Sequence, residues 1–339
     1  MSSQELLGRL IRQEPAEQPL WAALWRRLDR DEVSPTELAA VLTAASLPGV
    51  DGATLVGFVR SLQAPADRTT VPGESVNIVG TGGGPRTFNV STASALVAAA
   101  AGAHVVKTGS RGYSSAVGAT EIVERAGFPV AKSNDDIRVH TQAHRIAFTG
   151  HQVYPAQLVR IARRIVPLGM RSFGAFLNQV GPFLADVPVT AQLTGVSASF
   201  RMSQMSRLVQ VVPGREITLV SSQCGIDELV SCSRSLVVHP DGEVRVIEPG
   251  EFATGDGGLA DLAPVDPERA VEHLAEVVDG RACRTATATV VLNAALLLQL
   301  AGCNNSFRDA VDTAQDTIAS GLASSLMETL AARTVASGV

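Results

Sequence analysis

Hydrophobic positions recur with helical spacing in the first part of the chain. Up to about residue 65, apolar residues fall three or four apart, and Leu6, Leu7, Leu10 and Ile11 share one face of a predicted helix. The segment Ser34–Glu37 is typical of a helix start, with a serine cap, a proline in the first turn and a glutamate that completes a capping box. No strand pattern occurs before residue 76. The region is therefore predicted to be all-helical.

After a polar, proline-containing stretch near residues 64–74, short apolar runs alternate with helical patterns. Strand followed by helix predicts a mostly parallel sheet, hence an α/β fold. The predicted strands are Ser75–Val79, His104–Val106, Gln192–Val196, Glu216–Ser221, Ser235–Val238 and Glu243–Ile247, the last two joined by a turn at His239–Gly242. Helices are predicted over Thr92–Ala101, Glu121–Ala126 and Ala286–Leu300.

Length and composition favour two unequal domains, a helical one and a larger α/β one. The chain has 339 residues, which is long for a single domain. Hydrophobic residues make up 45% and charged residues 18%, enough apolar material for a large core. Aromatic residues make up only 4%, so the core must consist mainly of alanine, valine, leucine and isoleucine. That composition suits helices packed on a parallel sheet.

The charge and the cysteines limit the partners and the compartment. A net charge of −5 gives no global attraction to nucleic acid or to an anionic membrane. The four cysteines form no CxxC pair, and reduced thiols are expected. The N-terminus lacks the pattern of a signal peptide, and the most apolar stretches are too short or too interrupted for a membrane span. We therefore expect a cytoplasmic protein that binds neither nucleic acid nor membrane.

A glycine-rich turn lies between the first predicted strand and the helix that follows it. Glycines allow a backbone to approach an anion closely, and the helix start adds unpaired amides. Taken alone, such a segment can be a plain turn with a Ser/Thr helix cap. It is neither a Walker A loop nor a Rossmann fingerprint. The candidate phosphate ligands are Gly80, Thr81, Gly82, Gly83, Thr87, Asn89, Ser91 and Thr92.

A second candidate anion loop follows the next predicted strand. It runs from Lys107 to Ser115 and places a lysine and an arginine among small residues. A solvated charged loop is the alternative. Because the carboxyl ends of parallel strands meet at one edge of a sheet, two such loops favour a site for pyrophosphate or for two phosphates.

Two adjacent carboxylates, Asp227 and Glu228, follow the apolar strand that ends near residue 221. Hard oxygen ligands at such a position suit Mg²⁺, which keeps several waters and bridges substrate phosphates. The alternative is a surface helix start with acidic residues near the positive end of the helix dipole. A magnesium site would match the phosphate loops, because a pyrophosphate leaving group needs its charge neutralised.

Together these motifs resemble those of the anthranilate phosphoribosyltransferase family, in order and nearly in spacing. The matching segments are Gly80–Gly83, Asn89–Thr92, Lys107 with Gly109, Ser114-Ser115 before Gly118, Asn178 with Gly181-Pro182, Asp227-Glu228, and Asn293–Ala295 with Ala301-Gly302. The resemblance covers nearly all of the chain after residue 70. It implies a Mg²⁺-dependent transfer of 5-phosphoribosyl from phosphoribosyl pyrophosphate to an aromatic acceptor.

The resemblance also implies residue roles and an organisation. Phosphoribosyl pyrophosphate would be bound by the glycine-turn residues above and by Lys107, Gly109, Ser114, Ser115 and Ala119, and the metal by Ser91, Asp227 and Glu228. The helical domain, residues 1–70, would take in a second segment near 165–190. The α/β domain would then comprise residues 71–164 and 191–339, with the active site at the hinge. Family members are usually homodimers, which we expect here.

The acceptor side departs from the family pattern. Ser110 stands where an asparagine is expected, Thr108 where a histidine is usual, and Tyr154 replaces the histidine before a Pro-Ala pair. Arg164 keeps the spacing of the family's acceptor-binding arginine, although Arg163 adjoins it. The candidate acceptor residues are Gly80, Ser110, Tyr154, Arg164 and Pro182. We hypothesise retained chemistry with an altered aromatic or heterocyclic carboxylate as acceptor.

No residue stands out as a general base. His140, His144 and His151 are interpreted as solvated or structural. A dissociative ribosyl transfer needs mainly positioning and charge neutralisation, so this absence is tolerable. Two alternative functions share the fold: a pyrimidine nucleoside phosphorylase, which the Asp227-Glu228 pair disfavours, and a non-catalytic nucleic-acid-binding protein, which the acidic charge disfavours.

Overall fold

The chain folds into two compact units, each built from separate stretches of sequence. The computed structural model describes residues 3–47, 49–63, 71, 73–109, 118–166, 168–169 and 173–336, with side chains as far as residue 332. The smaller unit comprises Met1–Asp67, Tyr154–Asp186 and Phe200–Gly214. The larger unit comprises Arg68–Val153, Val187–Ser199 and Arg215–Val339. In what is described, no helix combines the length and the apolar character that a bilayer span requires.

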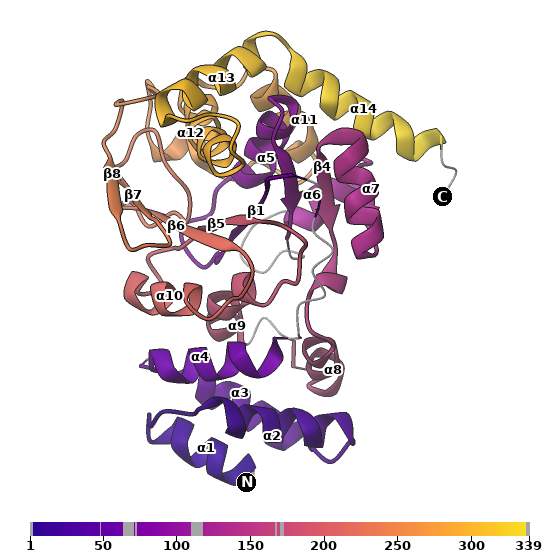
Figure 1. Ribbon diagram of the computed structural model, residues 1–339, viewed down its shortest axis with the longest axis vertical. Helices are drawn as coiled ribbons and strands as arrows, with labels where there is room; N and C mark the ends of the chain where they lie inside the picture. Colours follow the sequence, from indigo (N-terminus) through magenta and orange to yellow (C-terminus); the bar gives the residue numbers. More distant parts are fainter. Residues whose placement is uncertain are drawn as a thin grey trace. The chain divides into compact units, whose positions relative to one another are not determined.

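In its described residues the smaller unit contains helices joined by turns and no strand. Figure 1 shows its first four helices packed together, α1 against α3 and α2 against α4. Leu6 and Leu10 of α1 are buried as predicted, but Ile11 at the end of that helix is 60% exposed. The elements are α1 (Ser3–Ile11), α2 (Gln18–Asp29), α3 (Pro35–Ala45), α4 (Gly52–Leu62), α8 (Ala156–Arg164), α9 (Gly174–Val180), the 3-10 turn η3 (Gly181–Phe183) and α10 (Met202–Val209).

An aromatic cluster forms the core of this helical unit. The ring of Phe58 meets Trp21 edge-on at 4.9 Å between centroids and Phe176 at 4.8 Å. Trp25 stacks on Trp21 at 6.0 Å. Edge-to-face and offset pairs are the favoured aromatic geometries. The low overall aromatic content did not suggest this cluster, because composition does not show where in the fold the few aromatic residues gather. Phe176 belongs to the second segment of the unit, and its contact with Phe58 attaches that segment to the first.

The second segment of the helical unit begins earlier than the sequence-based boundary of about residue 165. Helix α8 packs on α2 and α3, and Arg160 forms an ion pair with Asp29. A third segment also belongs to the unit, because α10 packs on α4 and the side-chain amide of Gln204 donates to the Val50 carbonyl at 2.9 Å. Amphipathic patterning locates helices but does not reveal which surface each one covers.

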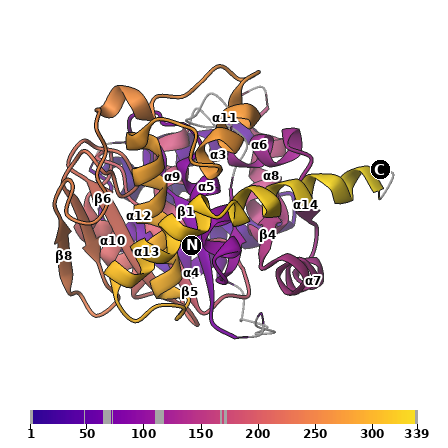
Figure 2. The same ribbon diagram turned by 90° about the horizontal axis from the view of Figure 1, so that it is seen from above.

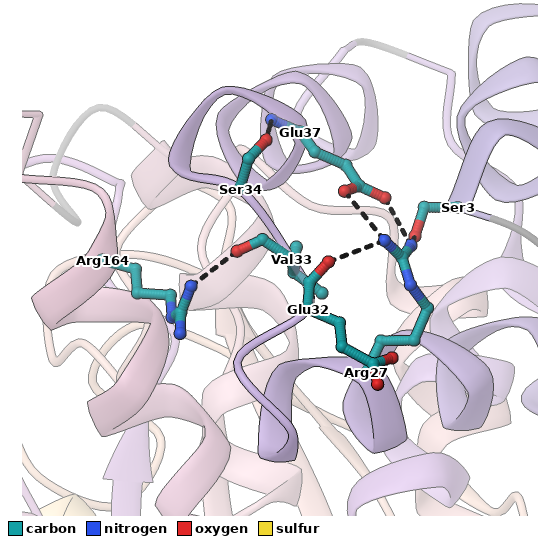
Figure 3. A network of polar contacts seen from close by, with 7 residues as sticks. All are labelled: Ser3, Arg27, Glu32, Val33, Ser34, Glu37 and Arg164. Atoms are coloured by element: carbon teal, nitrogen blue, oxygen red, sulfur yellow. Dashed lines mark hydrogen bonds and ion pairs between the residues drawn. The ribbon is translucent and has the colours of Figure 1, made fainter.

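A polar network joins the first three helices of the helical unit (Figure 3). The guanidinium of Arg27 donates to both oxygens of Glu37, at 2.6 and 3.2 Å, and to the Glu32 carbonyl at 2.8 Å. It also contacts the Ser3 hydroxyl. As predicted for a helix cap, the Ser34 hydroxyl accepts from the Glu37 N–H at 3.1 Å. Hydrogen bonding from Arg27 outweighs burial and lowers the pKa of Glu37.

We expect Glu37→Gln to lower the free energy of unfolding by about 1 kcal/mol at pH 7, since the pair is only partly buried. Glu37 has a lowered pKa when folded, so its contribution is present at neutral pH and is lost as pH falls through that lowered pKa. Urea unfolding at several pH values measures both effects. Glu272→Gln, which removes an exposed ion pair with Arg269, is the control and should change stability by less. Equal losses in the two variants would contradict the expectation.

The larger unit is built on an eight-stranded sheet in the order β3-β4-β2-β1-β5-β6-β7-β8. The six strands from β3 to β6 are parallel, and β7 and β8 are added antiparallel. The strands are β1 (Ser75–Gly80), β2 (His104–Lys107), β3 (Val130–Ala131), β4 (Ile146–Thr149), β5 (Ala191–Gly195), β6 (Glu216–Ser222), β7 (Ser235–Val238) and β8 (Val244–Ile247). The predicted α/β class is confirmed, and so is the turn between β7 and β8, where Gly242 donates to the His239 carbonyl. The prediction missed β4 and also β3, which is only two residues long.

Alanine-rich helices cover the sheet. Helix α12 is buried along most of its length and packs on α5, α13, β1 and β5 (Figures 1 and 2). This arrangement explains why most of its residues are apolar. The helices are α5 (Val90–Ala100), α6 (Ala119–Arg125), α7 (Asn134–His144), α11 (Ala270–Val278), α12 (Arg284–Leu300), α13 (Phe307–Ala319) and α14 (Leu322–Ala336), with 3-10 turns η1 (His151–Val153) and η4 (Leu259–Leu262).

Candidate active site

The glycine turn lies at the carboxyl end of β1 and touches the acidic pair. Gly82 and Gly83 have positive φ angles of 63° and 80°, and a residue with a side chain would be strained at these angles. The N–H of Gly82 donates to Oδ2 of Asp227 at 2.7 Å. The structure therefore brings together the glycine turn and the carboxylate pair, which lie about 145 residues apart in the sequence.

Two further glycines make this approach possible. A Cβ on Gly80 would lie 2.3 Å from Oδ2 of Asp227, and a Cβ on Gly195 would lie 1.8 Å from the Asp227 carbonyl oxygen. Gly80 ends β1 and Gly195 ends β5, which pair in register. The acidic pair thus sits directly over the ends of two central strands, where open parallel sheets bind ligands.

Hydroxyl groups after β5 hold the glycine turn in shape. The Ser197 hydroxyl donates to the Gly82 carbonyl at 2.7 Å, and the Ser199 hydroxyl donates to the Gly83 carbonyl at 2.6 Å. Thr81 is buried, and its hydroxyl accepts from the Ser197 N–H at 3.1 Å. Thr81 therefore shapes the turn from inside. The sequence reading missed both serines, although their position just beyond a predicted strand end was a usable signal.

The start of α5 offers further groups for an anion. Asn89 is the N-cap residue, and Ser91 lies in the first turn, partly buried. Thr92 is fully buried, and its hydroxyl has no hydrogen-bond partner in the described part of the protein. A buried hydroxyl without a partner is costly unless a ligand satisfies it. The Thr87 hydroxyl lies 3.5 Å from Oε2 of Glu228 and links this helix start to the acidic pair.

Lys107 ends β2 and is 4% exposed. Its ammonium donates to the carbonyl of the next residue, Thr108, at 2.6 Å. Burial lowers the pKa of Lys107 to about 8, and the nearby charges of Glu228 and Asp227 oppose that shift. At neutral pH the lysine is therefore a buried cation beside two carboxylates.

The carboxylates themselves are crowded. Burial raises the pKa of Asp227, against the hydrogen bond from Gly82. Burial, followed by the charge of Asp227, raises the pKa of Glu228 well above its ordinary value. Two like charges kept together in this way are relieved by a divalent cation, and carboxylate and hydroxyl oxygens are the donors that Mg²⁺ prefers. The residues present fit a magnesium ion.

The protein provides only part of a coordination shell. Throughout the described ranges, no group of three or more His, Cys, Asp or Glu side chains is arranged to hold a metal. Mg²⁺ commonly uses one or two carboxylates together with substrate phosphates and waters. A two-carboxylate site beside anion-binding loops matches this usual coordination of Mg²⁺.

A buried amide network fixes the residue after Lys107. The Asn77 amide donates to Oε1 of Gln192 at 3.0 Å, and its oxygen accepts from the Thr108 hydroxyl at 3.0 Å and from the Thr108 N–H at 3.2 Å. All three residues are fully buried. Thr108, which stands where the resembled family has a histidine, is therefore part of the sheet interior.

A small, partly open pocket lies beside the lysine strand. Its lining includes the predicted residues Lys107, Gly109 and Ala119, and a Cβ on Gly109 would lie 2.6 Å from that of Ala119. The lining also includes Thr149, whose buried hydroxyl has no hydrogen-bond partner among the residues that are described. The sequence analysis did not single out Thr149. The predicted residues Ser110, Ser114 and Ser115 lie outside the described residues.

Gly80 belongs to the larger unit, whereas the other described acceptor candidates belong to the helical unit. Tyr154 is partly buried and Pro182 is buried in η3. Arg164 ends α8, where it donates to the Val33 carbonyl at 2.6 Å and contacts Asp31. Figure 3 shows the bond to Val33. Its acceptor role stays a prediction.

Comparisons with known proteins agree with this geometry. Residues 73–324 match the model of the glycosyl transferase family, a/b domain. The anthranilate phosphoribosyltransferase of Beijerinckia indica is 30% identical over 306 residues, which cover 89% of this chain and 88% of that protein.

Solved structures show the same fold. The anthranilate phosphoribosyltransferase of Thermus thermophilus aligns with a TM-score of 0.80 at 26% identity and covers 97% of this chain and 99% of its own. The enzyme of Saccharomyces cerevisiae in complex with PRPP and Mg aligns with a TM-score of 0.76 at 22% identity, over 99% of this chain and 94% of its own. From its family match, its relatives and its fold, this chain belongs to the anthranilate phosphoribosyltransferase family of glycosyltransferases.

Proposed function

We propose that the protein is a pentosyltransferase that moves 5-phosphoribosyl from phosphoribosyl pyrophosphate to anthranilate or a closely related aromatic carboxylate, releasing pyrophosphate. One observation carries this proposal. The glycine turn after β1, Lys107 at the end of β2 and the pair Asp227–Glu228 converge within the larger unit. Each supplies a group that a sugar diphosphate with its metal requires.

Each part of the site has a distinct task. The backbone amides of the glycine turn and the start of α5 would bind phosphate oxygens, and buried Lys107 would balance their charge. Asp227 and Glu228 would hold Mg²⁺, which when bound neutralises charge on the leaving pyrophosphate. The protein's own contribution is to orient the anomeric carbon and to fix these charges in advance.

The yeast enzyme that aligns with this chain was solved with PRPP and Mg, which supports the same pair of ligands here. The decisive experiment measures pyrophosphate release from phosphoribosyl pyrophosphate and Mg²⁺ across a panel of aromatic carboxylates that includes anthranilate. Release that depends on both the acceptor and the metal is expected. Free base released instead from nucleosides and phosphate would indicate a phosphorylase, and tight binding of single-stranded DNA without any release would indicate a non-catalytic protein.

The same panel settles the acceptor. The departures at Ser110, Thr108 and Tyr154 predict that some other aromatic or heterocyclic carboxylate is used better than anthranilate. Turnover of anthranilate equal to or better than every alternative would remove the basis of that hypothesis and leave anthranilate as the substrate.

Arg164→Ala should raise the KM for the acceptor at least about tenfold, because a carboxylate loses a charge-assisted hydrogen bond, and should leave the KM for phosphoribosyl pyrophosphate nearly unchanged. Arg160→Ala is the matched control, since Arg160 lies one helical turn earlier in α8 and also forms an ion pair within the helical unit. If both variants lose thermal stability and keep the native KM for the acceptor, Arg164 attaches α8 to the loop at Val33 and does not bind the acceptor.

A further inference from the structure

Helix α12 buries three polar side chains among its many apolar ones. Thr285, Thr289 and Asn293 follow one another at intervals of four residues, so they lie on one face of the helix. They are between 0 and 1% exposed. A buried polar group is costly unless it is hydrogen-bonded, so the partners of this stripe indicate what it does.

Asn293 is bonded to the residue that follows the acidic pair. Its side-chain oxygen accepts from the Leu229 N–H at 3.1 Å, and its amide nitrogen donates to the Leu229 carbonyl at 2.8 Å. The second amide hydrogen goes to the Thr289 carbonyl within α12, also at 2.8 Å. The side chain thus satisfies both backbone groups of Leu229, as a neighbouring strand would, and no other amide orientation gives every donor an acceptor.

The two threonines hold Ser231, two residues further along. The Ser231 hydroxyl donates to the Thr285 carbonyl at 3.1 Å, so the Thr289 hydroxyl must donate to it across 3.0 Å. In return the Thr289 oxygen accepts from the Ser231 N–H at 3.2 Å. The Thr285 hydroxyl accepts from the Gly257 N–H at 2.9 Å. The backbone after Glu228 is therefore bonded to one face of one helix.

We propose that this polar face of α12 positions the Asp227–Glu228 pair for metal binding, with Asn293 as the main positioning residue. This inference rests on the proposed function. The pair is held from one side by the Gly82 N–H and from the other by Asn293 through Leu229, the residue next to Glu228. The two anchors keep together carboxylates that repel each other, so the site is formed before the cation arrives.

The test uses three variants of the full chain. Asn293→Leu removes all three hydrogen bonds while keeping the number and branching of the non-hydrogen side-chain atoms, Thr289→Val removes the hydroxyl, and Thr289→Ser keeps it. The first readout is hydrogen exchange at the Leu229 and Ser231 amides, without metal or substrate. The second is Mn²⁺ affinity in the presence of phosphoribosyl pyrophosphate, measured by electron paramagnetic resonance. We expect roughly tenfold faster exchange at Leu229 and roughly tenfold weaker Mn²⁺ binding in Asn293→Leu. Thr289→Val should act in the same direction at Ser231, and Thr289→Ser should recover native values.

Ser94→Ala is the control. The buried Ser94 hydroxyl shares its hydrogen between the Val90 carbonyl of α5 at 2.9 Å and the Val290 carbonyl of α12 at 3.2 Å, so its loss weakens the contact between these two helices at a point that does not bond residues 229–231. This variant should lose thermal stability with native Mn²⁺ affinity.

Native Mn²⁺ affinity in Asn293→Leu and Thr289→Val, or an equal loss in Ser94→Ala, would overturn the inference while leaving the proposed function intact. Failure of the unmodified chain to bind Mn²⁺ with phosphoribosyl pyrophosphate would overturn the proposed function and the inference with it.

Discussion

Replacing Glu228 by glutamine should reduce pyrophosphate release about a hundredfold or more and should raise the melting temperature of the metal-free protein at pH 8. The two effects have one cause. Glu228 is partly buried beside Asp227, and its pKa is raised well above the ordinary value near 4.5. Its ionised form is therefore unfavourable in the folded protein without a cation, and it is that form which the metal requires. A neutral amide removes the repulsion together with the ligand.

The pH dependence gives this prediction a sign. Because the folded-state pKa of Glu228 is raised, the folded protein holds a proton that the unfolded chain has already released above about pH 4.5. The metal-free protein therefore loses stability as pH rises from that value towards the raised pKa. The Glu228→Gln variant lacks this loss. Calorimetric melting at successive pH values, with and without Mg²⁺, measures the difference between the two proteins.

Glu216→Gln supplies the control. Glu216 is exposed at the start of β6, the strand that leads to the acidic pair. That variant should keep its pyrophosphate release and should show the stability–pH curve of the unmodified chain. A Glu228→Gln protein that stays active, or one that melts lower than the unmodified chain at pH 8, would show that the carboxylate is a structural group.

Gly80→Ala should abolish most of the activity while leaving the protein folded. The added methyl group would lie 2.3 Å from Oδ2 of Asp227, so the carboxylate must leave the Gly82 N–H to which it is bonded. A side-chain carboxylate can move, which makes the cost moderate for the fold and severe for the site. We expect a loss of activity of about a hundredfold, and a change in the free energy of unfolding of about 1–3 kcal/mol.

Gly195→Ala is the informative comparison. There the methyl group would lie 1.8 Å from the backbone carbonyl oxygen of Asp227, so the chain itself must shift. This variant should lose more stability than Gly80→Ala in urea unfolding. Gly174→Ala, in α9 with no atom within 4 Å of the added carbon, should leave both stability and activity unchanged. If Gly80→Ala keeps full activity, the contact between the glycine turn and Asp227 has no role in the reaction.

The parts of the candidate site could be found as motifs because each part is local in sequence. The glycine turn, Lys107 and the acidic pair each follow an apolar strand, and parallel strands end at the same edge of the sheet. The α/β class followed from the same alternation of strand and helix. A glycine such as Gly82 can be recognised from a single sequence as a turn residue, because few other residues adopt a positive φ.

The groups that hold the site were not predictable in the same way. Ser197 acts on the glycine turn from the segment after β5, and Asn293 acts on Leu229 from a helix 64 residues away. The sequence around a serine or an asparagine in an apolar segment does not show which group its side chain will bond. The two compact units differ from the expected domain bounds for a related reason, since the packing of α8 and α10 depends on shape complementarity between helices that are distant in sequence.

The aromatic core of the helical unit also provides a spectroscopic tool. Trp21 and Trp25 are the only two tryptophans of the chain, and both belong to this unit. Intrinsic indole emission therefore follows unfolding of the helical unit alone, whereas far-ultraviolet ellipticity follows both units. Midpoints that differ between the two signals would show that the units unfold as separate cooperative blocks, and coincident midpoints would show that they unfold as one.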